Sequence, residues 1–185
     1  YIVDMYVRYF GKAPSVAEIE KYEEFGKPKL ILTEIIGDAD DSKATLTTKE
    51  FVNNAFQNLF GRDATTKEMN KYSKVVDKGE DLPINAIVKA AKKSDKGVYE
   101  AKKAIAIMLA EKDITTNYNL DKITKATYAD VYNLKTKTLL VDSVAALETK
   151  IEKMPDNVAG KAFTLTASID TLPGTEKGDV FNGIV

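Results

Sequence analysis

Two short stretches of this 185-residue chain combine side chains that could bind a polysaccharide. The stretch Asn117-Tyr118-Asn119 joins an aromatic ring, which packs on the apolar face of a sugar, to amides that reach its hydroxyl groups. A lysine-rich patch, which could pair with phosphate or acidic sugar groups, comprises Lys89, Lys92, Lys93, Lys96, Lys102 and Lys103. The ordinary alternatives are an inter-helix loop and a solvated helix surface.

Two acidic groups could hold a metal ion. Asp170 and Asp179 lie among glycine-rich turns, and their carboxylate oxygens are ligands that Ca²⁺ prefers. Aspartate also favours turns without any metal, so a capped turn is the alternative. The stretch Asp38, Asp40 and Asp41 lacks the glycine and the final glutamate of an EF-hand and indicates a solvated loop. The sequence therefore predicts calcium as a possible cofactor, bound at Asp170 and Asp179.

Composition excludes several kinds of chemistry. The chain has no cysteine and no histidine, which removes thiol nucleophiles and Ser-His-Asp triads and favours a protein that is not an enzyme. The net charge of -1 argues against nucleic acid as a partner. No apolar run approaches the roughly 20 residues of a membrane span.

The aromatics Tyr99, Tyr118, Tyr128 and Tyr132 lie outside the repeated apolar stripes and are further candidates for stacking on a sugar.

An internal repeat positions these side chains. Residues 1–22 match residues 51–72 without a gap, so that Phe10 corresponds to Phe60 and Gly11 to Gly61. In each copy apolar residues spaced three and four apart predict a helix that ends at the glycine. A second helix should begin at a capping box, because Ser15 and Thr65 each precede a glutamate by three residues. Thr47 and Glu50 repeat this spacing at the start of copy two.

Further patterns predict a mainly α fold, a helical-hairpin repeat bundle of about seven to nine helices, followed by a short β segment. Helices are expected over residues 30–36, ending at Gly37, and over 82–92, 98–112, 122–134 and 136–153. Alternating apolar and hydroxyl residues predict a strand over 162–172. We therefore expect a helical domain over 1–155, with copies over 1–46 and 47–96, and a linker and the start of a β-roll or β-domain over 156–185.

Two motifs resemble known families. The aromatic-rich helix followed by Phe-Gly-Lys/Arg and Ser/Thr-x-x-Glu resembles a helical repeat of secreted bacterial surface and RTX-type proteins. The tail from Phe163 to Phe181 resembles the junction at which a calcium-binding β-roll begins in Gram-negative S-layer proteins of the Caulobacter and Campylobacter kind. It departs from that pattern at Ala167-Ser168 and Lys177-Gly178.

The second resemblance implies a function at the cell surface. The helical part would be an N-terminal anchoring domain that binds lipopolysaccharide through its O-antigen. The protein would leave the cell by type I secretion and self-associate in an extracellular surface lattice, the S-layer. The alternative hypothesis is a non-catalytic helical module of a larger RTX-type secreted enzyme or adhesin, which the sequence after Val185 would distinguish. A third hypothesis is an interaction scaffold with no surface ligand.

Overall fold

The structure is a computed structural model that describes residues 1–41, 46–78, 83–112, 118–154, 163–164 and 181–182. The chain divides into two units, Tyr1–Met154 and Pro155–Val185. In its described residues the first unit is built of α-helices with a few two-residue strands, which confirms the predicted mainly α fold. None of the described helices combines the length and the apolarity that crossing a bilayer requires.

The first two helices of each copy of the repeat fold alike, whereas the third differs in length. Copy one consists of α1 (Ile2–Phe10), α2 (Val16–Glu23) and α3 (Pro28–Asp41), and copy two of α4 (Thr48–Phe60), α5 (Thr66–Val76) and α6 (Ile84–Lys89). Both glycines after the first helix adopt the left-handed conformation, with φ of 69° at Gly11 and 61° at Gly61. Both halves of the capping box form at Ser15, Thr47 and Thr65. The predicted stops at Gly11 and Gly61 and the predicted starts at Ser15, Thr47 and Thr65 are confirmed.

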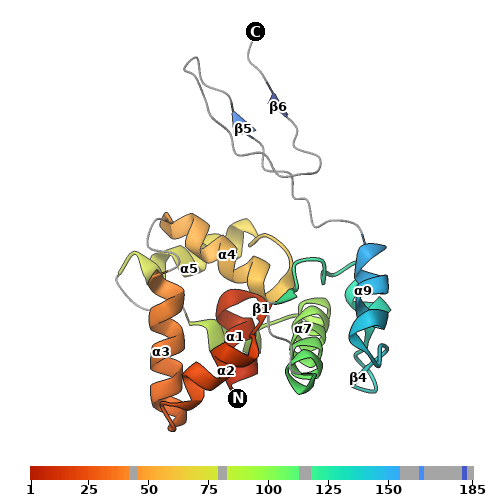
Figure 1. Ribbon diagram of the computed structural model, residues 1–185. Helices are drawn as coiled ribbons and strands as arrows, with labels where there is room; N and C mark the ends of the chain where they lie inside the picture. Colours follow the sequence, from red (N-terminus) through yellow and green to blue (C-terminus); the bar gives the residue numbers. More distant parts are fainter. Residues whose placement is uncertain (42–45, 79–82, 113–117, 155–162, 165–180, 183–185) are drawn as a thin grey trace. The chain divides into compact units, whose positions relative to one another are not determined.

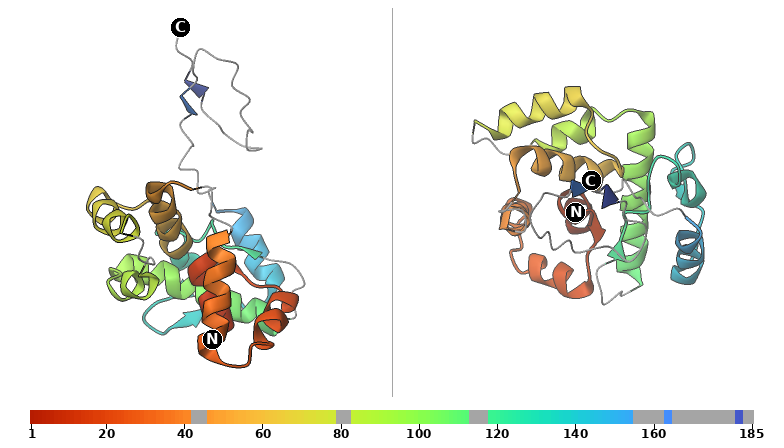
Figure 2. Two further views of the ribbon diagram at one scale, coloured as in Figure 1. Left: turned by 90° about the vertical axis from the view of Figure 1, so that its left-hand side faces the viewer. Right: turned by 90° about the horizontal axis from the view of Figure 1, so that it is seen from above.

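The long helix α7 (Lys93–Glu111) packs against both copies. It contacts α1 and α4 on one side and the segment containing α8 (Tyr128–Val131) on another, as Figure 1 and Figure 2 show. The face predicted to be apolar is buried at Ala101, Ile105 and Leu109. The helix begins at Lys93 rather than at residue 98, so the two lysines at its start stand at a helix N-terminus.

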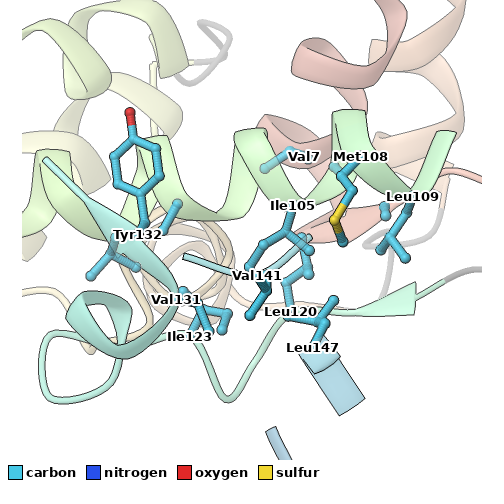
Figure 3. Close-up of a cluster of buried hydrophobic side chains, with 14 of the residues drawn as sticks. Val7, Ile105, Met108, Leu109, Leu120, Ile123, Val131, Tyr132, Val141 and Leu147 are labelled. Atoms are coloured by element: carbon cyan, nitrogen blue, oxygen red, sulfur yellow. The ribbon is translucent and has the colours of Figure 1, made fainter. Parts of the chain in front are cut away.

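A second layer of the core lies under α7. Strand β1 (Lys12–Ala13) pairs antiparallel with β2 (Tyr118–Asn119), and β3 (Tyr132–Asn133) pairs antiparallel with β4 (Thr138–Leu139). The helix α9 (Val144–Glu152) completes this layer. Figure 3 shows Ile105, Met108 and Leu109 of α7 facing side chains of this layer, which include Leu120, Val141 and Leu147.

Several predicted helix bounds are wrong. The helix predicted to end at Gly37 continues to Asp41, because burial of Ile31, Ile35 and Ala39 outweighs the helix cost of one glycine, about 1 kcal/mol. The predicted helix over 122–134 shrinks to α8, and that over 136–153 begins only at Val144. The helix predicted over 82–92 is α6, which covers only Ile84–Lys89.

A hairpin replaces the end of the helix predicted over 122–134 and the start of the helix predicted over 136–153. The side-chain oxygen of Asn133 accepts hydrogen bonds from the backbone N–H groups of Lys135 and Thr136, at 3.0 and 3.3 Å. Lys137 adopts a positive φ of 57°, which turns the chain back toward β4. Asparagine competes with a helix through this kind of local hydrogen bond. In the second unit, β5 (Phe163–Thr164) pairs in parallel with β6 (Phe181–Asn182).

Candidate functional site

The start of α7 separates two hollows of the surface. Lys92 is its N-cap residue and Lys93 its first helical residue, and both side chains are exposed. The side chain of Lys92 makes no capping hydrogen bond. The first N–H groups of a helix lack partners within the helix, and the helix dipole is positive at this end. A ligand that carries acceptor oxygens would therefore be favoured here.

The first hollow, which we name the tyrosine hollow, has a volume of about 530 Å³. It is formed by the start of α7, by α8 and by the β3–β4 hairpin. Its lining residues are Lys93, Tyr128, Ala129, Tyr132, Asn133, Leu134, Lys135 and Leu140. Leu140 is 49 % exposed, so it presents an open apolar wall.

The glycine at position 97 places one wall of the tyrosine hollow. The ring of Tyr128 packs directly on buried Gly97, because a Cβ atom built there would lie 2.5 Å from the ring. Tyr132 is 4 % exposed, and its hydroxyl group points away from the aliphatic core in Figure 3. Burial raises the pKa of Tyr132, so the hydroxyl stays protonated at neutral pH. Packing against neighbouring residues therefore fixes the rings of Tyr128 and Tyr132 along one side of the tyrosine hollow.

This arrangement suits a carbohydrate better than a small charged metabolite. The lining is mainly apolar, with two tyrosines and two leucines, and polar groups come from Lys93, Asn133 and Lys135. Rings and aliphatic groups can pack on the C–H face of a sugar, while amide and ammonium groups reach its hydroxyls. The tyrosine hollow therefore has the surface chemistry of a sugar site.

The second hollow, which we name the basic hollow, has a volume of about 510 Å³. It lies between α5, the start of α7 and the segment that precedes α8. Its lining residues are Arg62, Thr65, Lys67, Glu68, Lys71, Tyr72, Ala90, Lys92, Ser94, Asp95 and Lys125. Cationic side chains in this set outnumber carboxylates by three, so the hollow is positively charged.

Arg62 stabilises one side of the basic hollow. Its guanidinium donates to both carboxylate oxygens of Glu68 at 2.9 Å and to both of Asp95 at 3.0 and 2.8 Å. A further N–H donates to the backbone oxygen of Asp63 at 2.8 Å. Hydrogen bonding to Arg62 lowers the pKa of Glu68 to about 2, so this carboxylate stays charged at neutral pH. All five guanidinium N–H groups are thereby used, and Arg62 ties α4, α5 and α7 together.

The structure separates the residues predicted to bind a polysaccharide. Lys92 lines the basic hollow and Lys93 the tyrosine hollow. Tyr118 and Asn119 form β2. Tyr118 is half-buried against the core, and Asn119 pairs with Lys12 of β1. The side-chain oxygen of Asn119 accepts the N–H of Asp121 at 2.9 Å. Asn117 lies outside the described residues.

One lysine of the predicted patch is not on the surface. Lys102 is fully buried, and its ammonium group donates to the backbone oxygens of Gln57 and Asn58, at 3.1 and 2.9 Å. Burial lowers its pKa to about 8. It therefore satisfies carbonyl groups near the end of α4 instead of facing a ligand, and its assignment to an exposed patch was wrong.

The hollows contain residues that the sequence patterns did not single out. Lys67, Lys71 and Lys125 are close to Lys92 only because α5 and the segment before α8 pack beside the start of α7. Asn133 was assigned to the helix predicted over 122–134, and Lys135 to the junction with the helix predicted over 136–153, so their hairpin was missed. The available signal was the asparagine in Asn133-Leu-Lys-Thr-Lys137, a residue that favours turns.

The predicted calcium ligands, Asp170 and Asp179, lie outside the described residues. Asp38 belongs to α3, where it accepts hydrogen bonds from Lys21 and from the hydroxyl group of Tyr22. Among the described residues no group of three or more acidic side chains is close enough to hold a metal ion.

Comparison of the chain with models of protein families finds no match, and neither do comparisons with curated proteins and with solved structures. The assignment of function therefore depends on the chemistry of the two hollows and on the sequence motifs. Both hollows border the start of α7, where Lys92 and Lys93 are consecutive in the chain.

Proposed function

We propose that this chain is a non-catalytic anchoring domain of a secreted S-layer protein and that it binds lipopolysaccharide at the cell surface. The tyrosine hollow carries this proposal, because Tyr128 and Leu140 offer apolar walls while Lys93 and Asn133 offer polar groups beside them. The resemblance of the tail from Phe163 to Phe181 to S-layer junctions supports the choice of glycan. Calcium at Asp170 and Asp179 remains part of the proposal.

The openness of the tyrosine hollow suits binding by many copies. An open hollow that holds part of one sugar chain gives a weak site, since few ligand groups are desolvated there. Self-association in a lattice places many such sites on one cell. Linked sites raise the overall affinity about 100-fold or more without any new contact. Lattice formation and anchoring would therefore reinforce each other.

The test compares cells that differ only in their glycan. The purified chain should bind cells that carry O-antigen at least about tenfold better than cells stripped of it. Tyr128→Leu should abolish the difference, because it removes an aromatic wall while keeping an apolar side chain. Tyr1→Leu is the matched control, since Tyr1 is 58 % exposed and does not line the tyrosine hollow.

Two outcomes would contradict the proposal. Equal binding to both kinds of cell would exclude the O-antigen as the ligand. Equal loss of binding in the Tyr128 and Tyr1 variants would exclude the tyrosine hollow as the site. Because Tyr128 also packs on the core, thermal unfolding of each variant is measured, and Lys93→Gln tests the same hollow through an exposed side chain.

A further inference from the structure

The basic hollow brings together four lysines from three segments of the chain. Lys67 and Lys71 belong to α5, Lys92 precedes α7, and Lys125 lies in the segment before α8. These positions are far apart in the sequence, and only the packing of copy two beside α7 assembles them. Gathering like charges around one hollow is unfavourable unless an anion or solvent compensates them.

The carboxylates of the basic hollow compensate only one of these four charges. Glu68 and Asp95 are both bound by Arg62, whose single positive charge leaves this group a net charge of -1 against four lysines. None of the four lysines forms an ion pair with any residue that the structure describes. The ammonium group of Lys71 lies 4.9 Å from the ring centre of Tyr72, which orients it without neutralising it.

The start of α7 adds donors to the same hollow. Ser94 and Asp95 belong to its first turn and line the hollow, so the backbone N–H groups at this end lie beside the lysines. A helix N-terminus together with lysine side chains is a favourable environment for a phosphate group. Lysine suits phosphate as a point charge, whereas the guanidinium of Arg62 is already used by carboxylates.

We propose that the basic hollow binds the phosphate group of a phosphorylated sugar, and that the neighbouring sugar of the same glycan occupies the tyrosine hollow. Lys92 and Lys93 connect the two hollows, since consecutive Cα atoms are about 3.8 Å apart. A glycan that crosses the start of α7 can therefore reach both. The identity of the glycan depends on the proposed function, but the preference for phosphate does not.

The experiment is a titration of the whole chain, followed by NMR, with glucose 6-phosphate, inorganic phosphate and glucose. Glucose 6-phosphate should shift the amide signals of residues 93–95 in a saturable way and bind at least about tenfold more tightly than glucose. The double variant Lys67→Gln/Lys125→Gln should weaken this binding about tenfold, and added salt should weaken it further. Inorganic phosphate should compete for the same signals.

The matched control lies on the same helix. Lys74 is exposed on α5 but does not line the basic hollow, so Lys74→Gln should leave the affinity unchanged. All three lysines are exposed, and unfolding midpoints of the variants should stay close to that of the parent chain.

Three results would overturn the inference. One is binding of glucose 6-phosphate that is no tighter than binding of glucose, and another is an equal loss of affinity in the Lys74 variant. The third is tighter binding to phosphatidylcholine vesicles that contain phosphatidylglycerol, which would assign the phosphate to a lipid headgroup. Failure of the O-antigen test with phosphate binding intact would remove the proposed function alone.

Discussion

The two copies of the repeat hold the same capping glutamate in different ways. In copy one, Glu18 accepts a hydrogen bond from the hydroxyl group of Tyr6. In copy two, Phe56 replaces that tyrosine, and Glu68 instead accepts two hydrogen bonds from Arg62 at 2.9 Å. The backbone of the two capping boxes is the same, so the outward carboxylate can change its partner without changing the fold.

The change of partner has a consequence for α7. Arg62 extends from Glu68 to Asp95, and this connection fixes copy two against the start of α7, where both hollows lie. Copy one reaches α7 at another residue, Tyr99, whose hydroxyl group bonds to Asp4 and to Arg8. Copy two therefore contacts the start of α7, beside the two hollows, whereas copy one contacts α7 at Tyr99.

The largest expected contrast concerns the phenylalanine that precedes each glycine. Phe60 is 1 % exposed, whereas Phe10 is only partly buried. Phe60→Ala should lower the free energy of unfolding by about 4 kcal/mol, and Phe10→Ala by about half of that, because the cavity left is smaller. Urea unfolding followed by circular dichroism measures both values. Equal losses would show that the copies contribute equally to stability.

The next-largest contrast concerns the stability lost when Gly11 or Gly61 is replaced by alanine. Each has a positive φ. An added Cβ atom at Gly11 would lie 2.7 Å from the side-chain oxygen of Asn58 and 3.0 Å from its Cα atom, whereas at Gly61 it would lie 2.7 Å from the backbone oxygen of Ile123. The shortest contact at Gly11 is thus with a side chain, which can shift more easily than backbone can. We expect Gly61→Ala to cost about 3 kcal/mol and Gly11→Ala about 2 kcal/mol in unfolding experiments. A larger loss at Gly11 would contradict this reasoning.

These pairs show which parts of the molecule could be predicted from its sequence. The stop at Gly61 and the start at Thr65 depend on residues within one turn, so local patterns identified them. The hairpin around Asn133 was missed, because its apolar and polar residues also fit a helical period and the turn depends on side-chain hydrogen bonds. Local patterns define helix ends well where a side chain caps the backbone.

The candidate site was predictable only in part. Lys92 and Lys93 stood out as a charged pair, and both line hollows. Lys125 reaches the same hollow through tertiary packing, which no spacing in the sequence expresses. Lys102 looked like its neighbours in sequence but is buried, because α7 turns that face toward the end of α4. Charge pattern therefore located the region, and packing decided which charges face the solvent.

A smaller effect is expected from exchanging the glutamate's partner in copy one. Tyr6→Phe removes the hydroxyl group that donates to Glu18 and should cost about 1.5 kcal/mol, since the acceptor is charged. Adding Lys12→Arg reproduces the copy-two pair of residues and should recover part of this loss. A double-mutant cycle measures the recovery. If Lys12→Arg stabilises the parent chain equally, the two partners do not substitute for each other.

The smallest expected effect is the acid dependence that Glu68 adds to copy two. Its pKa is lowered to about 2 by the hydrogen bonds from Arg62, against a value of about 4.3 in an unfolded chain. A lowered pKa means that the carboxylate stabilises the fold above about pH 4.3, and that this contribution is lost as the pH falls toward 2. Because the pair is partly exposed to solvent, the contribution is about 1 kcal/mol.

Glu68→Gln should therefore lower stability at pH 7 and flatten the decline between about pH 4.3 and 2. Urea unfolding at a series of pH values measures both effects. Glu20→Gln is the control, because Glu20 is exposed on α2 and should leave the acid limb unchanged. An unchanged acid limb in the Glu68 variant would mean that Arg62 stabilises copy two through Asp95 alone. The link from copy two to the start of α7 would then not depend on the capping glutamate.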